Sequence, residues 1–193
     1  MRLGVVILPS ARWADAEERW RRCEELGFDA AYTYDHLSWR DFRDRPWFAM
    51  VPTLAAAAMA TTRLDLGPLV TTPNFRHPVS LAKDLVALDD LARGRLVVGV
   101  GAGGRGFDAT VLGDPAWGDA ERHQRFVEFT TLLARLRRGE AESGGGEFYR
   151  ADEVRLVPGP HSTPPPLLVS AMGPRAIELA ASLGDGWVSV GRR

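Results

Sequence analysis

The chain alternates short apolar runs with longer segments whose apolar residues recur every three or four positions. The run at 3–8 is the first of these. In the segment that follows, Trp13 and Trp20 share one helical face, and Gly27 ends the pattern. Runs that are apolar on both faces belong to buried parallel strands, and the amphipathic segments between them are crossover helices. This alternation predicts an α/β fold built of βα units.

Six strands and five helices follow from the alternation. These elements are compatible with two arrangements of the sheet, an open doubly wound sheet and a closed (β/α) barrel. An eight-fold barrel takes about 250 residues, and at least about 200, whereas this chain has 193. No boundary divides the sequence, so we expect residues 1–193 to form a single domain. The expected strands are 3–8, 30–34, 63–72, 95–101, 166–173 and 186–191. The expected helices are 13–26, 52–60, 78–93, 119–138 and 175–183. Residues 139–165 are expected to form a long excursion with a short hairpin near 148–156.

Helical spacing also predicts which residues are buried. Cys23 and Leu26 continue the apolar face of the first helix, and the third helix carries Leu81, Leu85, Leu88 and Leu91 on one face. Cys23 is the single cysteine of the chain, so no disulfide can form within it. We interpret Cys23 as a core residue and expect a reducing cytoplasm.

Composition excludes several classes of function. The 24 basic and 25 acidic residues give a net charge of -1, which predicts no binding to nucleic acid or to an anionic membrane. No stretch is long and apolar enough for a membrane span. The four histidines are far apart and show no short ligand spacing, so no metal site is expected.

The segment 101–106, GAGGRG, fits the pattern G-x-G-x-x-G directly after a strand. In a dinucleotide-binding fingerprint the third glycine opens a helix whose N-terminus faces a pyrophosphate. Here Gly113 and Pro115 interrupt the segment that follows, and the motif comes after the fourth strand rather than the first. A loop that lines a cofactor pocket at the carboxyl end of a barrel strand is favoured, and a tight turn without a ligand is the alternative.

Several stretches together resemble the bacterial luciferase-like monooxygenase family, and its actinobacterial branch that uses the deazaflavin coenzyme F420. They occur in family order and read LGVVILP, AEERWRRCEELGFDAAYTYDHLSWR, PNFRHPVSLAKDLVALDDLARGRLVVGVGAGG, RFVEFTTLLARL and PPLLVSAMGPRAIELAASLGDGW. The resemblance implies a TIM-barrel-like (β/α) fold with F420, or alternatively FMN, at the carboxyl ends of the strands. It also implies a homodimer and a small-molecule substrate.

The resemblance assigns the chemistry to Asp35 and His36, which follow the second strand. A histidine at this position lies beside the reactive face of the ring in related deazaflavin enzymes, and imidazole titrates near physiological pH. We expect Asp35 to orient the imidazole or the local backbone. The plain alternative is a strand-end histidine bonded to Asp35 or to the backbone.

Three further stretches match the family's cofactor-binding positions. The third-strand stretch is expected to contain a non-proline cis peptide between Leu69 and Val70. The turn at 170–173 is expected to hold phosphate, because glycine permits close approach and the next helix presents free N–H groups. The cofactor-binding residues implied by the resemblance are Leu69, Val70, Thr71, Thr72, Asn74, Gly101, Ala102, Gly103, Ser170, Ala171, Met172 and Gly173.

Two departures from the family pattern bear on function. Sugar-phosphate dehydrogenases of this superfamily carry an acid after the glycine pair of the fourth-strand loop, where this chain has Gly104 followed by Arg105. That difference argues against a sugar-phosphate substrate. The sequence also stops at Arg193, so we expect an incomplete barrel with about six of eight βα units.

The leading hypothesis is an oxidoreductase that transfers hydride between F420 and a small organic substrate. The alternatives are an FMN-dependent monooxygenase, a non-catalytic flavin-binding barrel and an open α/β dinucleotide protein. Trp39 and Trp47 either form an aromatic pocket wall or cover apolar surface. Arg76 or His77 could face a ligand, although packing over a neighbouring loop is an equally ordinary role for an arginine.

Overall fold

Six short strands run parallel in the order β1-β2-β3-β4-β7-β8 in this computed structural model, which describes residues 1–161 and 163–189. Neighbouring strands from β1 to β3 and from β4 to β8 form continuous ladders. Isolated bridges at Leu66–Leu96 and Thr71–Val100 join β3 to β4. The strands are β1 Gly4–Val6, β2 Ala30–Thr33, β3 Asp65–Pro68, β4 Val98–Val100, β7 Leu167–Ser170 and β8 Gly186–Val188.

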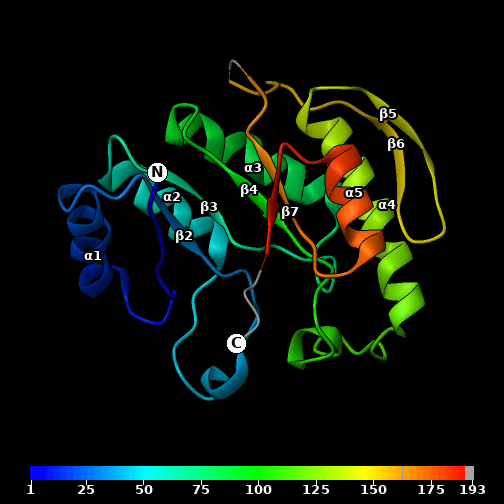
Figure 1. Cartoon of the computed structure of the whole chain (residues 1–193), viewed down its shortest axis with the longest axis horizontal. Helices are drawn as coiled ribbons and strands as arrows, with labels where there is room; N and C mark the ends of the chain where they lie inside the picture. Colours follow the sequence, from blue (N-terminus) through cyan, green and yellow to red (C-terminus); the bar gives the residue numbers. More distant parts are fainter. Residues whose placement is uncertain (162, 190–193) are drawn as a thin grey trace.

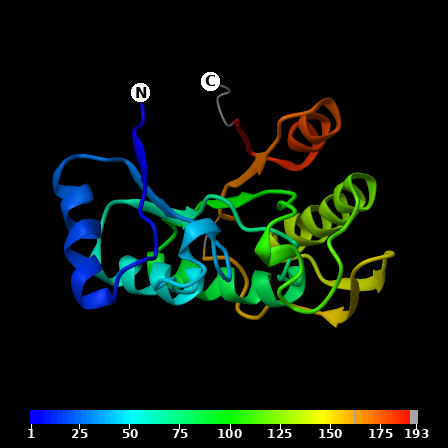
Figure 2. The same ribbon diagram turned by 90° about the horizontal axis from the view of Figure 1, so that it is seen from below.

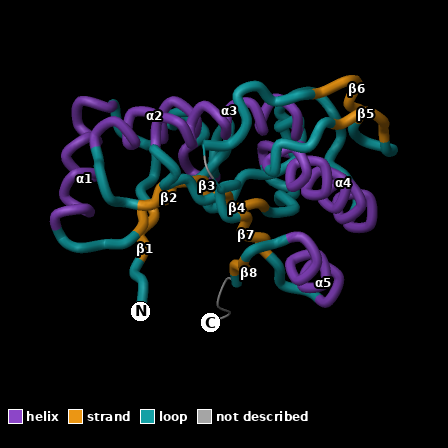
Figure 3. The backbone as a smooth tube through the Cα atoms, turned by 90° about the horizontal axis from the view of Figure 1, so that it is seen from above, coloured by secondary structure: helices purple, strands orange, loops and turns teal. Residues whose placement is uncertain are grey.

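The helices surround the convex side of this curved sheet, as in the wall of a barrel. Figure 1 shows the whole chain, and Figures 2 and 3 show the arc of strands with α1 to α5 along its outside. Each parallel connection passes through a helix, as the alternation in the sequence predicts. The elements are α1 Trp13–Glu25, α2 Met50–Ala60, α3 Pro78–Ala92, α4 Asp119–Arg137 and α5 Pro174–Leu183, with 3-10 turns η1 Arg40–Phe42 and η2 Phe107–Ala109.

A single apolar core fills the space between the sheet and the helices. Trp20, Met50, Phe126 and Phe129 are the largest of its fully buried side chains, each at most 1% exposed. Cys23 is half-buried and packs against this core, as expected. No helix among the described residues is long and apolar enough to cross a membrane.

The strands β3 and β4 approach each other closely because glycine occupies the contact positions. A Cβ at Gly67 would lie 1.7 Å from the Val97 carbonyl oxygen, and one at Gly99 would lie 2.5 Å from the Pro68 carbonyl oxygen. No side chain can occupy such a space. These glycines therefore allow the backbones of β3 and β4 to lie side by side.

The order of strands and helices is confirmed, but several local expectations are wrong. The expected third strand, 63–72, is regular only at Asp65–Pro68, and beyond it Thr71 pairs with Val100 only through an isolated bridge. Leu26 is 60% exposed because it lies beyond the last turn of α1. Leu91 is 39% exposed because Ala92, four residues after Leu88, takes the buried position. The last two residues of the expected strand 186–191 lie outside the described residues.

The hairpin predicted near 148–156 exists, but it begins earlier. Its strands are β5 Glu142–Gly145 and β6 Arg150–Val154, so Phe148 lies in the turn. A Cβ at Gly145 would lie 2.7 Å from Arg150 Cγ, so glycine permits the two strands to approach at this point. The first two residues of the glycine run 144–146, which the sequence places in the irregular excursion, therefore belong to a strand.

Candidate functional site

The carboxyl ends of the parallel strands meet at one edge of the sheet, and the predicted cofactor residues converge there. A Cβ at Gly101 would lie 2.6 Å from Val70 Cγ2 and 3.6 Å from Ser170 Cβ. The backbone N–H of Gly101 donates to the Thr71 carbonyl at 2.9 Å. Residues that follow β3, β4 and β7 are therefore neighbours, although they are far apart in the sequence.

The peptide bond between Leu69 and Val70 is cis, as expected. Backbone hydrogen bonds hold both sides of it, from Leu69 N–H to the Thr33 carbonyl at 2.9 Å and from Thr71 N–H to the Gly99 carbonyl at 2.8 Å. The cis bond thus lies between β2 and β4, at the edge where the predicted site residues meet.

Asp35 is the centre of a buried polar network. Its side chain is 1% exposed and accepts hydrogen bonds from Thr71 Oγ1 at 2.6 Å and from Arg76 Nε and Nη2 at 3.0 and 2.7 Å. Burial opposes the charge of Arg76, but the hydrogen bonds and the attraction of Asp35 raise the pKa of the guanidinium above its ordinary value. Asp35 therefore fixes the segment that follows β3, and its carboxylate does not bond to the His36 ring.

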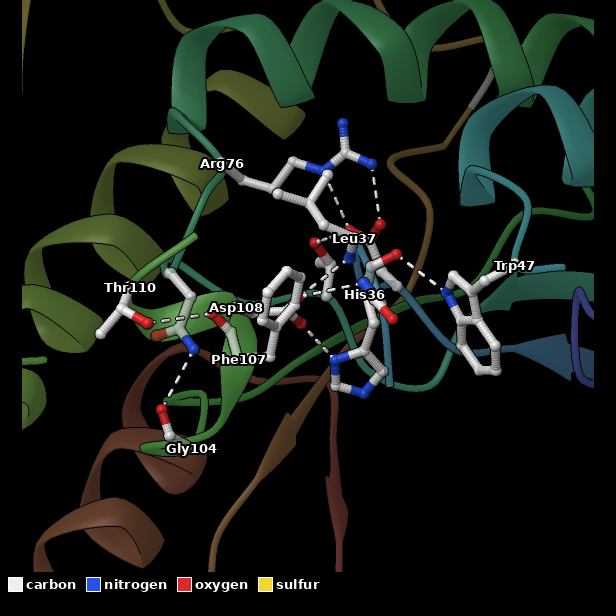
Figure 4. Close-up of polar contacts among 12 residues, drawn as sticks. His36, Leu37, Trp47, Arg76, Gly104, Phe107, Asp108 and Thr110 are labelled. Atoms are coloured by element: carbon white, nitrogen blue, oxygen red, sulfur yellow. Dashed lines mark hydrogen bonds and ion pairs between the residues drawn. The ribbon is translucent and has the colours of Figure 1, made fainter. Parts of the chain in front are cut away.

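The partner of His36 is Asp108, a residue that the sequence analysis missed (Figure 4). The His36 Nδ1 atom lies 2.5 Å from Asp108 Oδ2. Asp108 Oδ1 accepts from the backbone N–H groups of Leu37 and Ser38 at 3.0 and 3.3 Å. Of the two roles expected for Asp35, orienting the imidazole is wrong, because the 3-10 turn η2 places the carboxylate of Asp108 beside the ring; orienting the local backbone stays a prediction.

Aromatic side chains complete the surroundings of His36. The Trp47 indole N–H donates to the His36 carbonyl at 2.9 Å. The Trp39 ring stacks on the imidazole with an interplanar angle of 20°, and the ring centroids are 6.1 Å apart. Phe42 and Tyr34 contact Trp39 in turn. Trp39 and Trp47 thus belong to the cluster that holds His36, which supports the pocket-wall interpretation.

The glycine loop after β4 is held from two sides. Asn74 Nδ2 donates to the Gly104 carbonyl at 3.1 Å, and Arg122 Nη1 donates to the Gly103 carbonyl at 2.7 Å. Gly103 has φ +73°, and a Cβ there would lie 2.4 Å from Asn74 Oδ1. Ala102, between these glycines and Gly101, packs partly against the core. Only the short 3-10 turn η2, and no α-helix, begins after the third glycine, Gly106, so the loop does not have the form of a dinucleotide fingerprint.

The turn after β7 leads into α5. Ser170 is half-buried, Ala171 is buried and Met172 is 51% exposed. The Trp187 indole N–H donates to the Ala171 carbonyl at 2.8 Å and ties the turn to β8. Gly173 is the N-cap of α5, and a Cβ at this position would meet no atom within 4 Å. This part of the predicted site is the most open.

Sequence patterns gave little indication of Asp108. Asp108 lies 72 residues from His36, and the sequence around it shows no more than an acidic residue just after a glycine-rich loop. The sequence left two roles open for Arg76, facing a ligand or packing over a loop, and two for Trp47, forming a pocket wall or covering apolar surface. Their actual partners, Asp35 and the His36 carbonyl, depend on which strand ends become neighbours in the folded chain.

The fold and the site agree with a known family. The sequence profile described as luciferase-like monooxygenase matches residues 1–193, the full length of the chain. The chain belongs to this family. The resemblance found in the sequence is confirmed, and so is the expected α/β fold class.

Two relatives of this luciferase-like chain show what the family includes. The F420-dependent glucose-6-phosphate dehydrogenase of Beutenbergia cavernae is 39% identical over 168 residues, which are 86% of this chain and 49% of that protein. The F420-dependent hydroxymycolic acid dehydrogenase of Mycobacterium tuberculosis is 35% identical over 171 residues, 88% of this chain and 47% of that protein. The chain spans about half the length of these relatives.

A solved structure confirms the luciferase-like architecture. An F420-dependent secondary alcohol dehydrogenase, in complex with an F420-acetone adduct, superposes with a TM-score of 0.86 at 25% identity. The match covers 98% of this chain and 58% of the other. The six strands described above therefore belong to a luciferase-like (β/α) barrel fold.

Proposed function

We propose that this chain forms the deazaflavin site of an F420-dependent oxidoreductase, in which hydride passes between F420 and a small organic substrate. The observation that carries the proposal is the position of His36 at the carboxyl ends of the strands, where Asp108 contacts the imidazole Nδ1 and Trp47 holds the backbone carbonyl. The F420-dependent relatives support this choice of cofactor. The sequence analysis reached the same hypothesis, with FMN as the alternative.

The residues present fit a flat heteroaromatic ring with a phosphate-bearing side chain. Thr72 Oγ1 is buried and has no hydrogen-bond partner within the described part of the chain, so it can serve a polar edge of a ligand. A Cβ at Gly173 would meet no atom within 4 Å, and one at Gly104 would meet only the Gly106 backbone nitrogen at 3.8 Å, so a ligand can approach the backbone at both positions. In this proposal the backbone around Leu69–Val70 and the residues Thr71, Thr72 and Asn74 face the ring.

We place the phosphate of the cofactor at the N-terminus of α5. Pro174 is the first residue of the helix and lacks an N–H, but the N–H groups near the helix start carry the positive end of the helix dipole. Ser170 adds a hydroxyl beside this turn, and Gly173 permits close approach. We assign residues 170–173 to the phosphate, and Gly101, Ala102 and Gly103 to the neighbouring wall.

F420 supplies hydride chemistry at C5 of its ring, and the protein supplies position and proton handling. His36 is placed to accept or donate a proton at Nε2, because Nδ1 is engaged by Asp108. Asp35 acts indirectly, by fixing Thr71 and Arg76. The aromatic cluster of Trp39, Phe42 and Trp47 shields the imidazole from one side.

The substrate remains a small organic molecule of undefined class. The glucose-6-phosphate dehydrogenases are relatives, but Gly104 takes the place of the acid expected in enzymes for sugar phosphates. We therefore propose a substrate other than a sugar phosphate. We further propose that residues 1–193 act as one domain, within a homodimer of a cytoplasmic protein.

Fluorescence titration of the purified chain with F420, and in parallel with FMN, tests the cofactor. Saturable binding of F420 that is tighter than that of FMN is the expected result. In the same titration His36→Asn tests the contact of the imidazole with the cofactor, and His161→Asn is its matched control, because His161 lies in the exposed loop before β7. Tighter binding of FMN, or binding of neither by a chain whose circular dichroism shows the native fold, contradicts the proposal. Light scattering on the same samples tests the dimer.

A further inference from the structure

The two carboxylate oxygens of Asp108 contact different groups, and this division determines how His36 can work. Oδ2 faces His36 Nδ1 at 2.5 Å, while Oδ1 accepts from the backbone N–H groups of Leu37 and Ser38. We propose that Asp108 is a positioning residue that keeps the proton of neutral His36 on Nδ1 and leaves Nε2 as the proton acceptor of the site. This inference deepens the proposed function, and the catalytic role of Nε2 rests on that function.

The tautomer follows from the chemistry of the donors and acceptors. An ionised carboxylate only accepts hydrogen bonds, so the group that it contacts must donate. A neutral imidazole has one N–H and one bare nitrogen. If Nδ1 donates to Asp108, then Nε2 carries the lone pair. Asp108 is only 6% exposed, so solvent does not compete for this contact.

The ring has little freedom to leave this arrangement. The Trp47 indole N–H holds the His36 carbonyl, and Trp39 stacks on the ring. Nε2 makes no hydrogen bond to any residue that the structure describes, and Figure 4 shows this nitrogen pointing away from Asp108. The bare nitrogen is thus presented to whatever occupies the site.

Asp108→Asn gives a sharp test because the asparagine side chain has only one acceptor oxygen. The two backbone N–H groups of Leu37 and Ser38 require that oxygen at the position of Oδ1. The amide NH₂ then faces His36 Nδ1, and Nδ1 must become an acceptor. The proton of the neutral ring moves to Nε2. The variant changes one atom type and retains the shape of the side chain.

Histidine ¹⁵N NMR of the chain without cofactor reads the tautomer directly, at a pH where the imidazoles are neutral. His77 is an internal reference, because its Nδ1 accepts from the Val79 N–H at 3.2 Å and it must hold its proton on Nε2. His36 is expected to show the opposite pattern, with protonated Nδ1. In Asp108→Asn the two His36 nitrogens exchange their shifts, whereas His77 does not change. Asp114→Asn, an exposed acid in the same loop region, is the matched control and leaves His36 unchanged.

The outcomes separate this inference from the proposed function. Protonated Nδ1 in the wild type together with inversion in Asp108→Asn supports the inference, whether or not F420 binds. Protonated Nε2 in wild-type His36 overturns it without any variant, and so does an unchanged His36 pattern in a folded Asp108→Asn chain. Failure of F420 to bind, with the tautomers as expected, contradicts the proposed function alone.

Discussion

Removing the charge of Asp35 is expected to destabilise the chain more than any surface substitution. Asp35 accepts three hydrogen bonds, two of them from Arg76, whose side chain is 20% exposed. In Asp35→Asn the amide NH₂ replaces one acceptor, and the guanidinium loses its counter-charge. Removing one partner of such a buried pair costs about 3–5 kcal/mol, because the remaining charge stays desolvated.

A double-mutant cycle isolates the interaction between the two side chains. Asp35→Asn, Arg76→Met and the double variant are unfolded in urea, and the free energies of unfolding are compared. We expect each single variant to lose about 3 kcal/mol or more. The double variant should lose less than the sum, with a coupling energy of about 2 kcal/mol.

Glu17 and Arg21 provide the matched control pair. They form an ion pair of 2.6 Å on the outer face of α1, where both side chains are more than a third exposed. The corresponding cycle for this pair should give about 0.3–0.5 kcal/mol. A coupling for Asp35 and Arg76 no larger than that of the control pair would refute the view that this network fixes the site.

Two further predictions concern the frame of the fold. The Glu24 carboxylate accepts hydrogen bonds from the backbone N–H groups of Thr62, Arg63 and Leu64, just before β3. Partial burial opposes the charge of this carboxylate, but the hydrogen bonds hold its pKa below the ordinary value. Glu24→Gln should therefore lower the free energy of unfolding by about 1–2 kcal/mol at pH 7. In urea titrations the difference between the variant and the wild type should vanish as the pH falls below about 4, where the carboxyl takes up its proton. A difference that stays constant across pH contradicts this reasoning. Gly67→Ala should lower stability by about 3 kcal/mol or prevent folding, because its Cβ would overlap the Val97 carbonyl. Gly106→Ala, where no atom lies within 4 Å, is the control, and equal melting temperatures of the two variants would disprove the close-approach argument.

The sequence predicts the order of elements well because local patterns determine it. Apolar runs bounded by glycine and proline identify the six strands, and helical spacing identifies the five helices. Burial was predicted less well at helix ends, where Leu26 and Leu91 continue a pattern but have no core beside them. Packing at the end of a helix depends on its neighbours, and spacing along the chain does not contain that information.

The site shows the same division. The resemblance to the family pointed to His36 and the segment 69–74, and the structure places both at the carboxyl ends of the parallel strands. The pairing of side chains at this edge could not be found in the same way. Asp35 directly precedes His36 in sequence, yet it bonds to Arg76, while Asp108 reaches the imidazole from a loop 72 residues away.

The most direct test of this account follows the four histidines by NMR while F420 is added. His36 lies at the carboxyl ends of the strands, whereas His161 lies in the loop that leads to the amino end of β7. We predict that the ¹⁵N shifts of His36 change in proportion to the bound F420 and that those of His161 do not change. Binding of F420 that leaves His36 unchanged, or that shifts His161 instead, would contradict the location of the cofactor site.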